Sequence, residues 1–144
     1  MAVVSTLSNH CKYMKMTKKI DFDNDVFKII LMNTTFAFDK DAHATLADVT
    51  ASQLATGYGY TQDDKTLVLS SPVSEDDTND RALAEWDDVT WTATGDDIPA
   101  TGAAIVYDDT TTDDTVIGCI DFGSDYTTAN GSSTQIENIS FQDT

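Results

Sequence analysis

The chain is poor in the residues from which most active sites and metal centres are built. Its 144 residues include two histidines, two cysteines, two prolines and seven glycines. There is no CxxC pair or zinc-type cysteine–histidine spacing, and no G-x-S-x-G, P-loop or G-x-G-x-x-G motif. No apolar run approaches the roughly 20 residues of a membrane-spanning helix. These absences argue against nucleophilic catalysis, glycine-loop phosphate binding and a helical membrane anchor.

Positive charge is also scarce and is unevenly distributed. The chain has 25 acidic and eight basic residues, a net charge of −17. Residues 1–20 hold four lysines and no acid, so they carry +4, and residues 21–144 carry −21 from 25 acids and four bases. A body this negative repels nucleic acid and anionic membranes, because binding either one requires lysine and arginine. We therefore expect neither as a partner.

The charge distribution predicts two parts: an extended basic N-terminal arm, residues 1–20, and one domain, residues 21–144. The arm lacks the order of charges of a secretory signal, so we expect a protein made in a cytosol. We expect it to bind partner chains and to become ordered only on assembly. The residues expected to make these contacts are its lysines and the apolar side chains between them: Lys12, Tyr13, Met14, Lys15, Met16, Lys18 and Lys19.

Residues 21–144 show almost no helical periodicity. They contain seven or eight short segments rich in β-branched and aromatic residues, separated by Asp, Asn, Gly, Ser and Thr. We expect strands or extended pieces at 26–33, 58–60, 65–69, 82–86, 88–94, 103–107, 116–122 and 134–141. Leu46, Val49 and Leu54 suit a short helical turn capped by Thr50 or Ser52. The pattern predicts an all-β fold, a single antiparallel β-sandwich or barrel-like domain.

The sequence DDTTTDDT, residues 108–115, separates two of the predicted strands. An EF-hand calcium loop needs a central glycine and a closing glutamate, and both are missing here. Adjacent acids on an extended chain point in opposite directions, so Asp-Asp pairs aim poorly at one ion. Such pairs recur in five predicted loops or strand ends. We interpret 108–115 as a hairpin connection, and opportunistic calcium binding remains the alternative.

Catalytic groups are hard to assign. Two carboxylates across a cleft are the signature of a glycosidase, but 25 acids will satisfy that spacing by chance. His43, in KDAHAT, suits a surface or loop position better than a general base. Trp91 shares a strand face with Val89 and Ala93 and is expected in the core, whereas Trp86 and Tyr126 are undecided. Cys11 and Cys119 are expected to be free thiols. We predict no catalytic residue, no cofactor and no metal site.

Several segments together resemble a family of known proteins. They are SNHxKYxxM, IDFDNDVFKIILM, FDKDAHATLADV, QLATGYGYT, VTW, AAIVYDD and VIGCIDFG, which span most of residues 8–141. This arrangement resembles small structural proteins of tailed bacteriophages. The resemblance implies a β-rich, non-enzymatic virion protein made in the host cytoplasm, most simply a capsid-decorating or cement protein on the capsid surface. It also implies a trimer whose partners are other copies, the major capsid protein or other virion proteins.

Three alternatives to this interpretation stay open. One is a tail or tail-fibre component with a β-sandwich binding module. Another is a sugar- or metal-binding β-module at a host-contact tip. The third is a small hydrolase, which would need a cleft with paired carboxylates and a raised pKa on one of them.

Overall fold

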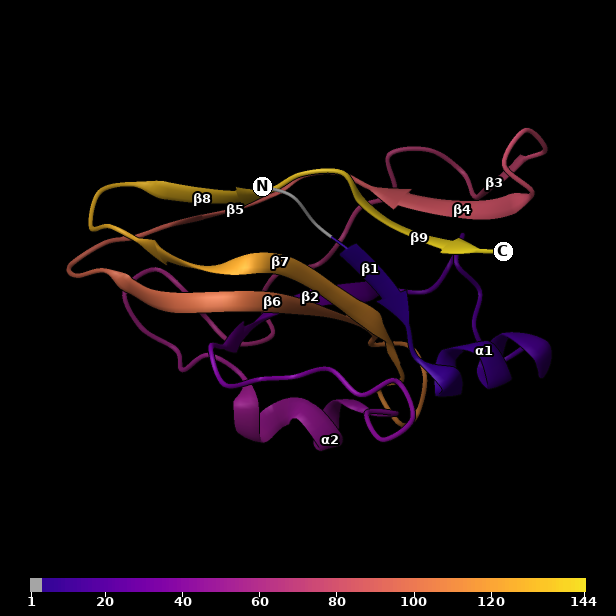
Figure 1. Ribbon diagram of the computed structural model, residues 1–144, viewed down its shortest axis with the longest axis horizontal. Helices are drawn as coiled ribbons and strands as arrows, with labels where there is room; N and C mark the ends of the chain where they lie inside the picture. The colour runs from indigo at the N-terminus through magenta and orange to yellow at the C-terminus, as the bar shows by residue number, and fades with distance from the viewer. Residues whose placement is uncertain (1–3) are drawn as a thin grey trace.

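Two layers of antiparallel strands stack face to face in the computed structural model, which describes residues 4–144 (Figure 1). One layer is a four-stranded sheet in the order β1-β7-β6-β2. Its strands are β1 (Val4–Leu7), β2 (Phe27–Asn33), β6 (Ile98–Asp108) and β7 (Val116–Thr128). The other layer holds two smaller sheets, β3-β4-β9 and β5-β8. Their strands are β3 (Ser74–Asp76), β4 (Arg81–Trp86), β5 (Val89–Thr92), β8 (Ser133–Ile136) and β9 (Ile139–Asp143). The all-β sandwich prediction is confirmed.

The main core lies between the two layers and follows the period of two expected for a half-buried strand. Trp91 and Ala93 are buried and Val89 is half-buried, whereas Thr90 and Thr92 are exposed, as the sequence predicted. The two undecided aromatic residues differ from each other. Trp86 is buried among Phe22, Phe27 and Phe141, and Tyr126 is 37% exposed.

Strand β2 is buried on both faces of the four-stranded sheet, which explains why it is an almost continuous apolar run. Ile29 and Leu31 face the main core, whereas Ile30 and Met32 belong to a second apolar cluster on the outer face. Helix α2 (Leu46–Val49) and the segment before it cover part of that outer face (Figure 1). The sequence placed a cap at Thr50 or Ser52, but these residues form the 3₁₀ turn η1 (Thr50–Ser52). The N-cap is Thr45, whose backbone N–H donates to Asp48 in a capping box.

Strands β6 and β7 are longer than the sequence indicated. The sequence predicts strands at 103–107 and 116–122, but β6 begins at Ile98 and β7 continues to Thr128. Shifts of register between Ile98 and Ala103 accommodate Pro99 and Gly102 in β6.

Two predicted extended pieces are irregular. Residues 57–60 form a turn in which the Gly57 N–H donates to the Tyr60 carbonyl at 2.8 Å. Residues 65–69 form only isolated bridges, Thr66 with Lys28 and Leu69 with Trp86, because they pass from β2 in one layer to β4 in the other.

The N-terminal segment differs most from its prediction. Described from Val4 onward, it forms strand β1, paired with β7 from Val4–Asp121 to Leu7–Gly118, and then helix α1 (Asn9–Met16). Cys11 is fully buried and Met14 is 6% exposed. This part of the chain is therefore integrated into the domain and is not an extended arm. Cys11 and Met14 are three residues apart, so these two buried side chains lie on one face of α1, a spacing that the prediction of an arm did not take into account.

Gly118 makes the docking of β1 possible. A Cβ atom at this position would overlap the Thr6 carbonyl and the Phe141 ring. No helix among residues 4–144 has both the length and the apolar character needed to cross a bilayer.

Candidate interaction surfaces

The acidic connection at 108–115 joins β6 to β7, which confirms the predicted hairpin. Its threonines serve the fold: Thr111 Oγ1 accepts from the Thr115 N–H at 2.9 Å, and Thr110 Oγ1 accepts from the Val26 N–H at 2.7 Å. Its acids point to different partners, because Asp109 pairs with Lys28 at 3.3 Å while Asp113 turns toward helix α1. The residues therefore hold the loop in place and do not converge on a common point.

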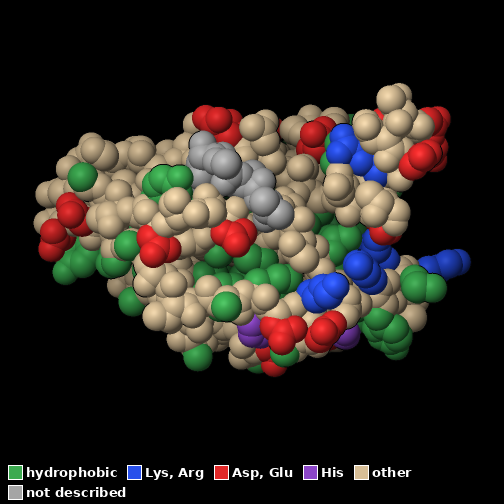
Figure 2. Space-filling view, in the orientation of Figure 1, with side chains coloured by type: hydrophobic (Ala, Val, Ile, Leu, Met, Phe, Trp, Pro, Cys, Tyr) green, Lys and Arg blue, Asp and Glu red, His purple; other side chains and the backbone are tan. Residues whose placement is uncertain are grey.

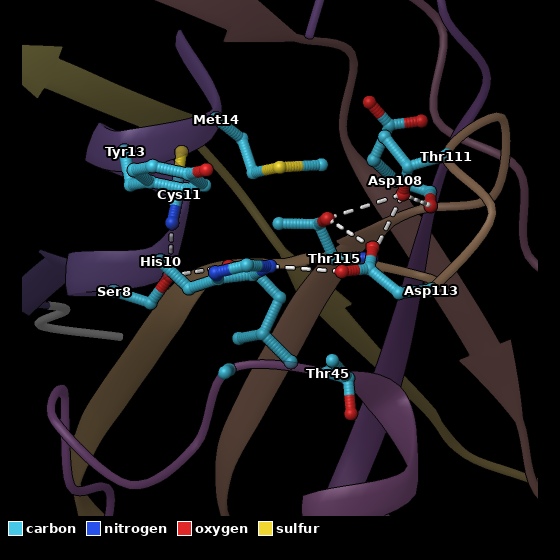
Figure 3. A network of polar contacts seen from close by, with 12 residues as sticks. Ser8, His10, Cys11, Tyr13, Met14, Thr45, Asp108, Thr111, Asp113 and Thr115 are labelled. Atoms are coloured by element: carbon cyan, nitrogen blue, oxygen red, sulfur yellow. Dashed lines mark hydrogen bonds and ion pairs between the residues drawn. The ribbon is translucent and has the colours of Figure 1, made fainter. Parts of the chain in front are cut away.

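Asp113 connects this loop to the N-terminal helix (Figure 3). Its carboxylate lies 2.8 Å from His10 Nε2 and accepts a hydrogen bond from the Thr115 hydroxyl. Partial burial works to raise the pKa of Asp113, but the hydrogen bonds from Thr115 and His10 outweigh it and hold that pKa below its usual range. Asp113 thus stays ionised and fixes the orientation of α1.

Asp108 is the unusual member of the loop. It is fully buried, and Oδ1 accepts from the Thr110 N–H at 2.8 Å, but Oδ2 has no hydrogen-bond partner. Burial, together with the nearby Asp25 carboxyl group, raises the pKa of Asp108 to about 7. Neither Asp108 nor Asp25 lines the groove described below, so this pair of carboxyl groups is not placed to meet a substrate there.

The other potentially reactive side chains are occupied or inaccessible. Among residues 4–144 no three His, Cys, Asp or Glu side chains come together to hold a metal ion. Cys11 and Cys119 are free, as predicted, and burial raises the pKa of each thiol to about 12, so both are poor nucleophiles at neutral pH. His43 accepts from the Asp39 N–H and stacks on Phe36, in the loop position that the sequence indicated.

The seven predicted contact residues fall into two groups, buried or paired residues and exposed ones. Met14 is buried, and Lys15 forms an ion pair with Asp143, so these two residues hold the helix in place. The other five are exposed, and Tyr13 and Met16 are 54% and 87% accessible. We call these five residues the α1 surface: Lys12, Tyr13, Met16, Lys18 and Lys19.

A groove of about 1100 Å³ opens on the outer face of the four-stranded sheet. Its apolar lining includes the buried Ala103 and Cys119 and the half-buried Phe36 and Phe38. Exposed acids also line it: Asp39, Asp41, Asp121 and Asp125. Figure 2 shows hydrophobic side chains in a hollow near the middle of this face, with acidic side chains around it. We call this feature the acidic groove.

The acidic groove was not predicted from the sequence. Its residues come from β1, β6, β7 and the segment 34–41, which are far apart in the sequence. One local feature of the sequence pointed to the groove: Phe36-Ala37-Phe38 is followed directly by charged residues. The two aromatic side chains there stand next to acids, and no helix or strand was predicted that would bury them. Comparison with family models, with curated proteins and with solved structures finds no match to this chain.

Proposed function

We propose that this chain is a non-enzymatic structural protein of a bacteriophage virion, which acts as a capsid-decorating or cement protein by binding other protein chains. The virion assignment is supported by the resemblance of residues 8–141 to small phage structural proteins. The observation that carries the binding role is the α1 surface. There an aromatic residue and a methionine are held outward on an anchored helix, the residue types enriched in protein interfaces.

The way α1 is anchored also favours a binding role. Ser8 donates to the Val116 carbonyl, His10 contacts Asp113, and Lys15 pairs with Asp143, so the helix is fixed along its length. A rigid helix loses little conformational entropy when it binds, and exposed Tyr and Met side chains therefore contribute more of their burial energy to affinity.

Binding to phage particles tests the proposal. Purified protein is mixed with phage heads and, separately, with tails that lack it, and occupancy is measured by quantitative mass spectrometry and electron microscopy. We expect regular occupancy on heads, reduced at least tenfold by the double change Tyr13→Ser and Met16→Ser. Val68→Ser is the matched control, since Val68 is an equally exposed apolar residue at 61% accessibility.

Two results would contradict the proposal. One is the absence of wild-type protein from both heads and tails. The other is equal loss of occupancy in the Val68 control, which would show that any exposed apolar residue matters. Occupancy on tails alone would instead favour the tail-component alternative.

A further inference from the structure

We infer that the α1 surface of one copy docks into the acidic groove of a second copy of this chain. The inference rests on the proposed function and deepens it, because it names the partner of the α1 surface. The α1 surface carries mainly positive charge and the acidic groove mainly negative charge.

The lysines of the α1 surface have no acidic partner within the described chain. Among residues 4–144 the ion pairs of lysine and arginine use Lys15, Lys28 and Arg81, whereas Lys12, Lys18 and Lys19 form none. These three lysines lie on α1 or directly after it, and α1 is at one end of the molecule (Figure 1); the exposed Tyr13 and Met16 belong to the same helix. The lysines provide a compact positive patch on a protein that is otherwise strongly negative.

The acidic groove has the opposite charge and a matching apolar floor. Asp39, Asp41, Asp121 and Asp125 line it, and Lys40 is the single basic residue in its lining. Insertion of Tyr13 and Met16 would cover Phe36 and Phe38, while the flanking lysines would meet the acids at the rim. Apolar contact at the centre with charge pairing around it is the usual anatomy of a protein interface.

The remaining charge of the molecule selects this orientation. Two copies with a net charge of −17 repel each other in most relative orientations. Among residues 4–144 the α1 surface is the one place where three lysines lie close together in the sequence, so the approach of α1 to an acidic region is favoured over contacts between two acidic faces. Within one chain the contact is prevented, since the Asn9 N–H donates to the Lys40 carbonyl at 3.0 Å and fixes the start of α1 beside its own groove.

The contact joins two different surfaces, so it is heterologous. Repetition of such a contact closes into a ring when the rotation between copies allows it. A ring of three copies is the arrangement that agrees with the trimer expected from the phage resemblance.

Charge reversal tests the contact in solution without phage particles. Self-association is measured by sedimentation velocity from 1 to 100 µM protein in 0.15 M NaCl. We expect the wild type to associate, and we expect the dissociation constant to rise at least tenfold for Lys12→Glu with Lys19→Glu. The same increase is expected for Asp121→Lys with Asp125→Lys.

Two controls make the test specific. Asp77→Lys with Asp87→Lys changes the net charge equally on exposed acids outside the groove, and it should associate at least as well as the wild type. An equimolar mixture of the two reversed variants should associate again, because each then meets an opposite charge. Thermal melting of every variant confirms that it is folded.

A monomeric wild type at 100 µM, equal effects of the groove and control variants, or no recovery in the mixture would overturn the inference. Particle occupancy, measured in parallel, separates it from the proposed function. A wild type that binds heads but does not self-associate contradicts only the docking contact. One that self-associates but binds no particle contradicts only the virion role.

Discussion

The Asp108 carboxyl group lies at the end of β6, where the connection to β7 begins, and it is out of contact with water. Its pKa of about 7 is well above that of an exposed aspartate, about 4, because burial and Asp25 both disfavour the ionised form. The folded protein therefore binds a proton more tightly at Asp108 than the unfolded chain does. This stabilising effect is complete below about pH 4 and is lost as the pH rises through about 7.

Asp108→Asn should remove that dependence, because the amide keeps the shape and cannot ionise. At pH 8 we expect the free energy of unfolding to increase by on the order of 1–3 kcal/mol relative to the wild type, and by less at pH 5, where Asp108 is still protonated in the folded protein. Urea unfolding at both pH values measures this effect. The exposed Asp77→Asn serves as control, and an equal effect of Asp108→Asn at the two pH values would contradict the account.

Gly118 is the second residue with a clear individual role. Gly118→Ala should lower the free energy of unfolding by about 2–4 kcal/mol, since the new methyl group would overlap the Thr6 backbone and separate β1 from β7. Gly102→Ala is the matched control, because its methyl group would meet only the movable side chain of Asp125. Denaturant unfolding of both variants measures the difference, and similar losses would show that β1 tolerates displacement.

Helix α1 depends on the residue that begins it. Ser8 Oγ accepts from the Cys11 N–H at 2.9 Å and donates to the Val116 carbonyl, so one buried hydroxyl both caps the helix and attaches it to β7. Ser8→Ala should cost about 1–3 kcal/mol, the loss of a cap plus a buried carbonyl without a partner.

Local loosening should accompany that loss of stability. In Ser8→Ala we expect Cys11 to react faster than in the wild type with a thiol reagent, as followed by mass spectrometry of the peptide that contains it. Ser5→Ala, at an exposed position in β1, should leave the rate unchanged. An unchanged rate in Ser8→Ala would show that α1 stays docked without its cap.

The elements that the sequence predicted correctly are those defined by local pattern. The β6–β7 hairpin has two apolar runs around a polar turn, and β5 alternates strictly around Trp91, so neighbouring residues were sufficient. The N-terminal segment was wrongly predicted to be an extended arm, because that prediction was based on its four lysines. Its fold depends on contacts of β1 with β7 and β9 and of α1 with β7, which are about 100 residues or more away in the sequence.

The residues of the α1 surface are neighbours in the sequence, whereas those of the acidic groove are not. Five of the seven predicted contact residues are exposed, and they stay close together because they are neighbours in sequence, on α1 and in the turn that follows it. The groove could not be foreseen, because strand order and the reach of α2 decide which part of the sheet stays uncovered, and neither is a local property.

For the whole molecule, the excess of negative charge opposes compactness. Three ion pairs of lysine or arginine occur among residues 4–144, and all involve partly exposed side chains, which contribute little. We expect the melting temperature to rise by several degrees between 0.02 and 0.5 M NaCl, as salt screens the repulsion. Potassium chloride should act equally. A melting temperature that falls with salt would show that ion pairs dominate.

The pairing of β1 with β7 has a consequence for biosynthesis. Val4 lies opposite Asp121, so the first strand finds its place only after most of the chain has left the ribosome. Until then Leu7 and Cys11 remain uncovered, and contacts between residues so distant in sequence form slowly. We therefore expect the N-terminal strand and helix to close the molecule last, so that newly made chains are vulnerable to aggregation for as long as translation continues.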